Sequence, residues 1–160
     1  MLQKDIELLK PEFKQIAKWI IETAFSKFRV RLYINETVRT QELQTAYYKQ
    51  GREPLDKVNA YRKSIKMWEI SEYENKRIVT NVSKIDKTKG HGAGLAIDVV
   101  PNNDWSSPQF SWNIIGVMVD FANDEYKDYL KSLNAKIVWG GNFKSIRGGD
   151  SPHIEMVYDS

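Results

Sequence analysis

Cysteine is absent from this chain of 160 residues, and histidine occurs only twice, as His91 and His153. Without cysteine, disulfide bonds and thiolate metal sites are excluded, so any bound metal ion must use nitrogen and oxygen ligands. Long apolar runs are missing as well, which argues against a membrane span. The composition, 41% hydrophobic and 28% charged residues, is that of a folded globular protein.

The chain also lacks a strong charge of either sign. Lysine and arginine number 24 against 21 acidic residues, which gives a net charge of +3, and no basic run is long enough to predict nucleic-acid binding. The first ten residues, MLQKDIELLK, alternate charged and apolar side chains and lack the apolar core of a secretory signal. We therefore expect cytoplasmic synthesis without a signal peptide.

The length predicts one compact domain over 1–160. Apolar spacings of three and four residues predict helices over 11–28, 40–50, 109–122 and 124–133. The helix over 109–122 is expected to bury Phe110 and Phe121. Alternating or apolar stretches predict strands over 29–35, 77–82, 94–100, 136–140 and 153–158. This order predicts an α+β fold, with helices packed on one side of a small antiparallel sheet.

Strand alternation places both an acid and a histidine on faces opposite to core residues. In the stretch LAIDVV, Asp98 lies on the face opposite to Leu95, Ile97 and Val99. In HIEMVY, His153 and Glu155 lie together on the face opposite to the apolar residues 154 and 156. If the two strands pair, Asp98 and His153 share one face.

His91 precedes Asp98 by seven residues, and the glycines at 92 and 94 allow the chain to return the imidazole toward the same face. Two imidazoles and one carboxylate, with a fourth position left for water, are typical of a catalytic zinc ion. Asp150, in a glycine-rich turn, is the best-placed general base, and Glu155 could accept a hydrogen bond from a ligand or act as a reserve base. Spacing alone leaves a second interpretation equally open, in which both histidines are surface or hydrogen-bonded core residues.

The stretches HGAGLAID and DSPH resemble the zinc signature of the D-Ala-D-Ala carboxypeptidase and L-alanyl-D-glutamate endopeptidase family, which includes bacteriophage endolysins. The resemblance implies a hedgehog/D-Ala-D-Ala peptidase-like fold and one Zn²⁺ ion bound by His91, Asp98 and His153. It also implies that Asp150 is the catalytic carboxylate. With this resemblance, the zinc interpretation is favoured over the structural one.

A second stretch, VRTQELQTAYYKQGR, is similar to a family pattern formed by Arg39, Gln44, Tyr48 and Gly51. The resemblance implies that Arg39 contacts the substrate or the developing oxyanion, and that Gln44 and Glu155 belong to the substrate-binding set. In the matching segment WGGNF, Trp139 is expected to wall the substrate groove. The resemblance covers about residues 30–158.

Two features depart from the family pattern. Lys89 stands where the family usually has serine, two residues before the first zinc histidine. The charged segment 52–77 is longer than the usual connection, so we expect a surface insertion that affects which stem peptide fits.

The function implied by the resemblance is that of a zinc-dependent peptidoglycan peptidase that hydrolyses stem-peptide amide bonds. We favour an endolysin-like L-alanyl-D-glutamate endopeptidase, a monomer whose partner is the stem peptide and which acts on the cell wall after release. Two alternatives stay open: a D-Ala-D-Ala carboxypeptidase, and a non-catalytic wall-binding or phage structural protein.

Overall fold

The computed structural model describes residues 2–144 and 149–159. The chain divides into two compact units, one formed by residues 1–2 and 39–86 and the other by residues 3–38 and 87–160. We call them unit 1 and unit 2. The single catalytic domain expected from the sequence therefore stays a prediction. Within the described ranges, no helix is both long and apolar enough to cross a membrane.

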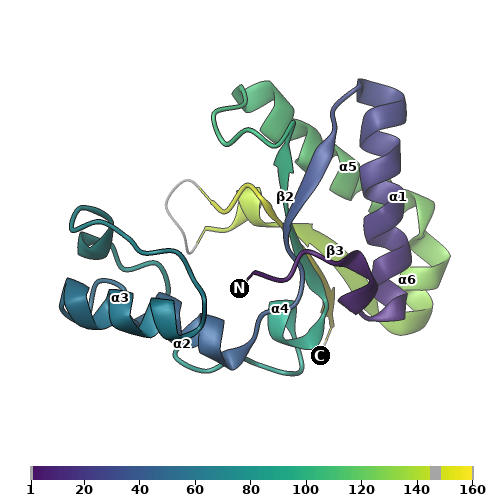
Figure 1. Ribbon diagram of the computed structural model, residues 1–160. Helices are drawn as coiled ribbons and strands as arrows, with labels where there is room; N and C mark the ends of the chain where they lie inside the picture. The colour runs from purple at the N-terminus through teal and green to yellow at the C-terminus, as the bar shows by residue number, and fades with distance from the viewer. Residues whose placement is uncertain (1, 145–148, 160) are drawn as a thin grey trace. The chain divides into compact units, whose positions relative to one another are not determined.

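Unit 2 contains a four-stranded antiparallel sheet in the order β1-β2-β4-β3 (Figure 1). Its strands are β1 (Leu32–Glu36), β2 (Ala96–Pro101), β3 (Ala135–Trp139) and β4 (His153–Tyr158). The two central strands, β2 and β4, correspond to the strands predicted over 94–100 and 153–158. The predicted α+β class with a small antiparallel sheet is confirmed.

The register of the central strands decides which side chains share a face. Asp98 pairs directly with His153, and Ala96 pairs with Glu155. Residues directly opposite one another in an antiparallel pair project to the same side. One face of the sheet therefore carries Asp98, His153 and Glu155, while Ile97 and Ile154 project to the other.

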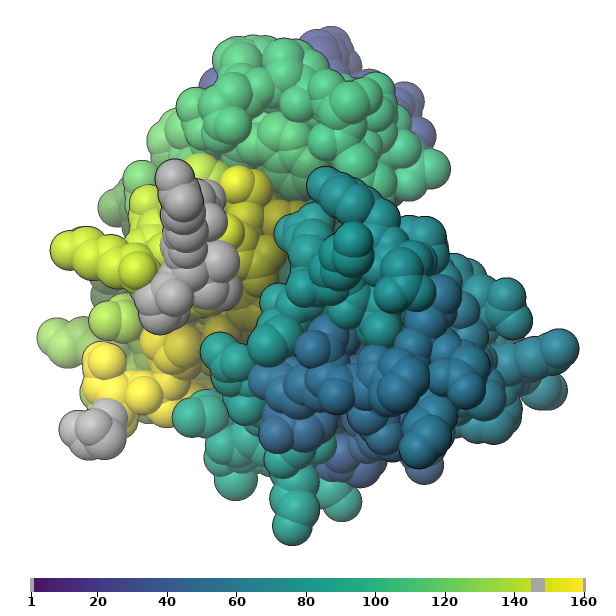
Figure 2. Space-filling view, turned by 90° about the vertical axis from the view of Figure 1, so that its left-hand side faces the viewer, coloured from purple at the N-terminus to yellow at the C-terminus, as the bar shows by residue number. Residues whose placement is uncertain are grey.

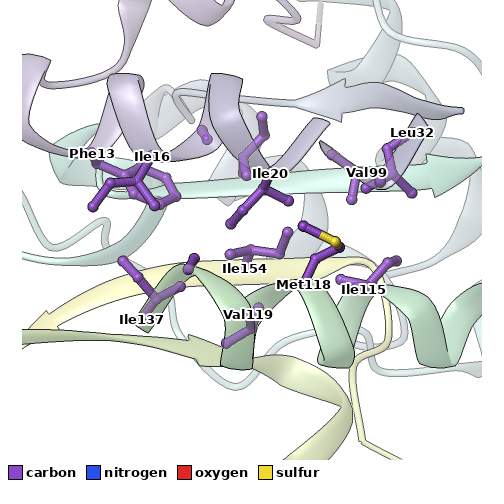
Figure 3. Packing of buried hydrophobic residues seen from close by; sticks show 14 of the residues in the cluster. Phe13, Ile16, Ile20, Leu32, Val99, Ile115, Met118, Val119, Ile137 and Ile154 are labelled. Carbon is purple, nitrogen blue, oxygen red and sulfur yellow. The ribbon is translucent and has the colours of Figure 1, made fainter. Parts of the chain in front are cut away.

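The apolar face is covered by three helices of unit 2, α1 (Pro11–Phe28), α5 (Gln109–Glu125) and α6 (Lys127–Leu133) (Figure 1). Their buried side chains interlock with those of the strands (Figure 3). The principal contributors are Phe13, Ile16, Ile20, Leu32, Val99, Ile115, Met118, Val119, Ile137 and Ile154. This packing confirms that helices lie on one side of the sheet and leaves the opposite face for polar groups.

Two aromatic residues of α5 lie outside this core. Phe110 is 63% exposed and Phe121 is 40% exposed, so the prediction that both are buried is wrong. The sheet and α1 contact only one side of α5, and Ile114, Ile115 and Met118 occupy that side.

Unit 1 contains α2 (Gln41–Lys49), α3 (Leu55–Ser64) and the short 3₁₀ turn η2 (Glu74–Lys76). Thr40 caps α2, because its side chain accepts a hydrogen bond from the backbone N–H of Leu43. Leu43, Ala46 and Met67 form a small buried cluster of their own. Segment 52–77, expected as a surface insertion, therefore contributes apolar side chains to the interior of unit 1.

The strand predicted over 77–82 is wrong, since these residues form neither a helix nor a strand. Hydrogen bonds from the side chains of other residues satisfy backbone carbonyls of this segment, as a neighbouring strand would in a sheet. Gln44 Nε2 donates to the Val82 carbonyl at 2.6 Å, and Arg52 Nη1 donates to the Thr80 carbonyl at 2.9 Å. Because the side chains of Ile78, Val79 and Val82 are exposed, no buried face holds the segment in a sheet.

Candidate metal centre

Asp98 stands between the two histidines of the chain. Its Oδ1 lies 3.2 Å from Nδ1 of His153 and 3.3 Å from Nε2 of His91. The three side chains each offer one ligand atom, and these atoms lie within 4.8 Å of one another. All three residues belong to unit 2, and the structure brings them together as the sequence predicts.

His91 reaches this position through the short helix α4 (Gly90–Ala93). Gly94 ends the helix with a left-handed φ of 72°, and the chain then enters β2. His91 Nδ1 lies 2.6 Å from the Thr37 carbonyl, an acceptor only, so this nitrogen carries the proton. Nε2 therefore turns its lone pair toward Asp98 Oδ1, which is also an acceptor, and it is buried without a hydrogen-bond partner.

His153 is held at both ring nitrogens. Nδ1 faces Asp98, and Nε2 lies 2.9 Å from Oε2 of Glu155. Burial alone would lower the pKa of His153, but the hydrogen bonds and charges of Asp98 and Glu155 outweigh it and raise the pKa to about 10. Without a metal ion, His153 is therefore an imidazolium at neutral pH.

The pKa of Asp98 shifts in the opposite direction. Burial would raise the pKa of its carboxyl group, but hydrogen bonding to His153 and the charge of that imidazolium hold the pKa well below its usual range. Asp98 is thus a carboxylate at any pH at which the protein would function. An anionic oxygen beside two imidazoles supplies the ligand types that zinc prefers in the absence of thiolates.

Two of the three spacings between the ligand atoms match the edge of a tetrahedral zinc site. Ligands at about 2.0–2.1 Å from such an ion lie about 3.3 Å apart along each edge. The two distances to Asp98 Oδ1, 3.2 and 3.3 Å, match this edge. A second observation agrees with a metal site. Nε2 of His91 is buried without a hydrogen-bond partner, and a bound cation would satisfy its lone pair.

The turn over 149–152 carries Asp150. The Asp150 N–H donates to the Gly140 carbonyl at 2.6 Å, and the Asp150 carbonyl accepts from the His153 N–H at 3.1 Å. Gly149 adopts a left-handed φ of 73°. The same turn therefore links the proposed general base to the proposed ligand His153.

Trp139 lies on the helix-covered side of the sheet. It pairs with Ile154, a core residue, and its indole packs against Gly116 of α5 and against Gly141. Its Nε1 donates to the Ser151 carbonyl at 2.8 Å. The structure thus gives Trp139 a packing role that supports the 149–152 turn, whereas its predicted contact with substrate stays a prediction.

Arg39 and Gln44 belong to unit 1. Arg39 Nη1 donates to Oε1 of Gln44 at 3.2 Å, and the guanidinium lies 5.1 Å from the centre of the Tyr47 ring. Gln44 is buried and also donates to Thr80 and Val82. Gln44 therefore fixes the side chain of Arg39, and the substrate contacts predicted for both residues stay predictions.

Sequence reasoning missed two groups that support the centre. The Thr37 carbonyl sets the tautomer of His91, but a backbone group leaves no signal in residue type. The ring of Phe143 lies 5.6 Å from that of His153, and its position four residues after Trp139 gave no indication of this contact.

Comparison with known proteins shows a likeness in fold. No protein-family model matches the sequence, and no curated protein sequence matches it significantly. Among solved structures, the chain is similar to the crystal structure of the Serratia marcescens L-Ala D-Glu endopeptidase ChiX, with a TM-score of 0.56 and 16% sequence identity. The match covers 95% of this chain and 83% of that one. The chain therefore shares the fold of an L-Ala D-Glu endopeptidase and carries in that fold a His, Asp, His group that could hold a metal ion.

Proposed function

We propose that this protein is a zinc-dependent peptidoglycan peptidase that hydrolyses amide bonds of the stem peptide. The observation that carries the proposal is the convergence of His91, Asp98 and His153, at edge distances of 3.2 and 3.3 Å, on the polar face of the sheet. The fold likeness to an L-Ala D-Glu endopeptidase supports the same reaction class. Hydrolysis of an amide requires an activated water and a proton carrier, and we propose a bound zinc ion and Asp150 for these two roles.

When bound, zinc supplies a Lewis acid and lowers the pKa of a water ligand to about 7. The Thr37 carbonyl holds His91 so that Nε2 is a lone-pair donor. Glu155 performs the corresponding task for His153, because its Oε2 accepts a hydrogen bond from the Nε2–H and leaves Nδ1 for coordination.

Asp150 acts as the proton carrier. As a carboxylate it accepts a proton from the attacking water, and as a carboxylic acid it returns that proton to the leaving amine. The tight turn at 149–152, tied to Gly140 and to the His153 N–H, sets the position of its backbone. Arg39, held by Gln44, is proposed to stabilise the negative charge that develops on the carbonyl oxygen.

The bond that we favour is the one between L-alanine and D-glutamate. The activity of the ChiX L-Ala D-Glu endopeptidase, which shares the fold, supports this choice over the D-Ala-D-Ala bond. We further propose that the protein acts as a monomer on the cell wall after release. The net charge of +3 favours contact with the anionic cell wall.

Digestion of purified muropeptides followed by mass spectrometry tests the proposal. We expect products that separate between L-alanine and D-glutamate. Release of free D-alanine would instead identify a D-Ala-D-Ala carboxypeptidase, and the absence of any product would favour a non-catalytic wall-binding protein.

The variant Asp150→Ala separates chemistry from metal binding. We expect it to retain zinc and the folded state but to lose wall lysis, because only the proton carrier is removed. Unchanged lysis in this variant would contradict the role of Asp150.

A further inference from the structure

A cavity of about 360 Å³ lies beside the turn that carries Asp150. Its lining residues are Trp105, Gln109, Trp112, Gly149, Asp150, Ser151 and Pro152, all of which belong to unit 2. In Figure 2 the green segment that follows β2 lies directly above the yellow segment that leads into β4. The cavity is formed where these two segments meet, and the mechanism above uses only Asp150 from it.

Two indoles form one wall of this cavity. Trp105 is 61% exposed, whereas Trp112 is only 8% exposed. Their ring centres are 5.9 Å apart and their planes are inclined by 37°. Trp112 is fixed in turn, because its Nε1 donates to the Ser107 carbonyl at 3.1 Å. The fixed indole of Trp112 thus packs against the indole of Trp105, and the exposed part of the Trp105 ring is available to a ligand.

The backbone around Trp105 is also ordered by its own side chains. Asp104 Oδ1 accepts from the Ser106 N–H at 2.9 Å and from the Ser106 hydroxyl at 2.7 Å. The Ser107 hydroxyl donates to the Pro101 carbonyl at 2.9 Å. Because the turn is stabilised on both sides of Trp105, little ordering entropy is lost when a ligand binds to its ring.

The chemistry of the lining selects the kind of ligand. Flat aromatic surface combined with a few hydrogen-bonding groups, here the Gln109 amide and the Ser151 hydroxyl, suits a neutral ring that bears hydroxyl and amide groups. Among the described lining residues, Asp150 is the only charged one and is negative, so it disfavours an anion such as the D-glutamate carboxylate. A cation would need a permanent negative partner, but Asp150 gains and loses a proton in the proposed reaction.

We propose that this cavity binds the N-acetylmuramoyl sugar of the peptidoglycan strand, with the apolar face of the sugar on Trp105. The proposal rests on the proposed function. In peptidoglycan the lactyl group of this sugar carries L-alanine, so the sugar lies only one residue from the L-Ala-D-Glu bond. A sugar site beside Asp150 therefore selects that bond and disfavours the D-Ala-D-Ala bond, which is distant from the sugar along the stem peptide.

The test compares two substrates that contain the same stem peptide, one with an N-terminal muramoyl group and one with an acetyl group. For the unmodified protein we expect kcat/KM to be about three- to tenfold higher with the muramoyl substrate, the range for one aromatic contact. Trp105→Ala should abolish this preference and leave kcat/KM for the acetyl substrate unchanged. Trp105→Phe, which retains a flat ring, should keep most of the preference.

Phe110→Ala is the matched control, because Phe110 is an exposed aromatic residue on the neighbouring helix that does not line the cavity. It should leave both rates unchanged. Equal rates for the two substrates in the unmodified protein would overturn the sugar site, as would an equal loss of both rates in Trp105→Ala. The preference for the muramoyl substrate should persist when the diamino acid of the stem peptide is removed from both substrates. Its loss after that change would also overturn the sugar site.

A binding measurement separates this proposal from the proposed function. The disaccharide of N-acetylglucosamine and N-acetylmuramic acid, without peptide and with its lactyl carboxyl group capped as a neutral amide, is titrated while the indole N–H signals are followed by NMR, with Trp105→Phe to assign the Trp105 signal. We expect the Trp105 signal to shift and the Trp19 signal to stay in place, even if neither substrate is hydrolysed. No shift of the Trp105 signal at saturating disaccharide would overturn the sugar site, whatever the activity.

Discussion

Asp98 and His153 face each other across β2 and β4, with Oδ1 of the aspartate 3.2 Å from Nδ1 of the histidine. The backbone register creates this contact, because the two residues are a directly paired position in the antiparallel ladder. The pair therefore exists before any ion binds. The third proposed ligand, His91, depends on α4 and on the Thr37 carbonyl.

Asp98→Asn should lower zinc affinity by at least about 100-fold, because it removes the only anionic ligand while keeping the shape of the side chain. Competition with a chromogenic chelator measures the effect. Asp128→Asn, at an exposed position in the first turn of α6, is the matched control and should bind zinc as the unmodified protein does. Equal affinities for both variants would mean that Asp98 is not a ligand.

Zinc binding should release a proton at neutral pH. In the metal-free protein the pKa of His153 is raised to about 10, so its imidazole must lose a proton before Nδ1 can coordinate. Between pH 7 and 9 the apparent zinc affinity should rise about tenfold per pH unit for this one group. Calorimetry in buffers of different ionisation enthalpy counts the protons released, and a count of zero would contradict the coordination by His153.

The metal-free protein should show the opposite trend in stability. A histidine whose folded pKa lies above its ordinary value of 6.5 stabilises the fold fully below about pH 6.5, and this contribution is lost as pH rises through about 10. The free energy of unfolding of the metal-free protein should therefore fall between pH 7 and 10. His153→Gln should flatten that decline, and an equally steep decline in this variant would assign it to other groups.

Glu155→Ala should weaken zinc binding about 10- to 100-fold, because His153 loses the acceptor that orients its ring through Nε2. Glu155→Gln keeps a carbonyl oxygen as an acceptor and should lose less. Zinc affinity is the readout, since it does not depend on turnover. If both variants bind zinc normally but lose activity, Glu155 is instead a group that contacts the substrate or transfers protons.

Trp139→Phe should cost about 1 kcal/mol of unfolding free energy, because the hydrogen bond from Nε1 to the Ser151 carbonyl is lost while most of the ring packing against Gly116 is kept. Since that bond supports the turn with Asp150, kcat should fall while zinc affinity stays unchanged. Denaturant unfolding and zinc titration check the two parts. A rise in KM with kcat unchanged would support the substrate contact predicted from the sequence.

The sequence was most informative where a two-residue period coincided with a change from apolar to ionisable side chains. This pattern placed Asp98 and His153 on one face, because alternation in a strand is a geometric necessity. The same rule, applied to Ile137 and Trp139, would have placed the indole in the core. The family resemblance pointed instead to the groove.

Contacts between distant segments account for what the sequence did not predict. The apolar residues of 77–82 read as a strand, but hydrogen bonds from Gln44 and Arg52, more than 25 residues earlier, satisfy that backbone outside any sheet. The exposure of Phe110 was likewise not predicted, because helical spacing does not show how much of the helix surface the neighbouring elements cover. The link from His91 to Thr37 spans 54 residues.

Elemental analysis of the active protein, purified without chelators, tests the metal centre most directly when it is combined with wall clearing before and after metal removal. We expect close to one zinc ion per chain, loss of clearing when a chelator removes it, recovery when zinc is returned, and no bound zinc in Asp98→Asn. Full clearing by protein that contains no zinc or other divalent metal would contradict the assignment of His91, Asp98 and His153 as a catalytic metal site.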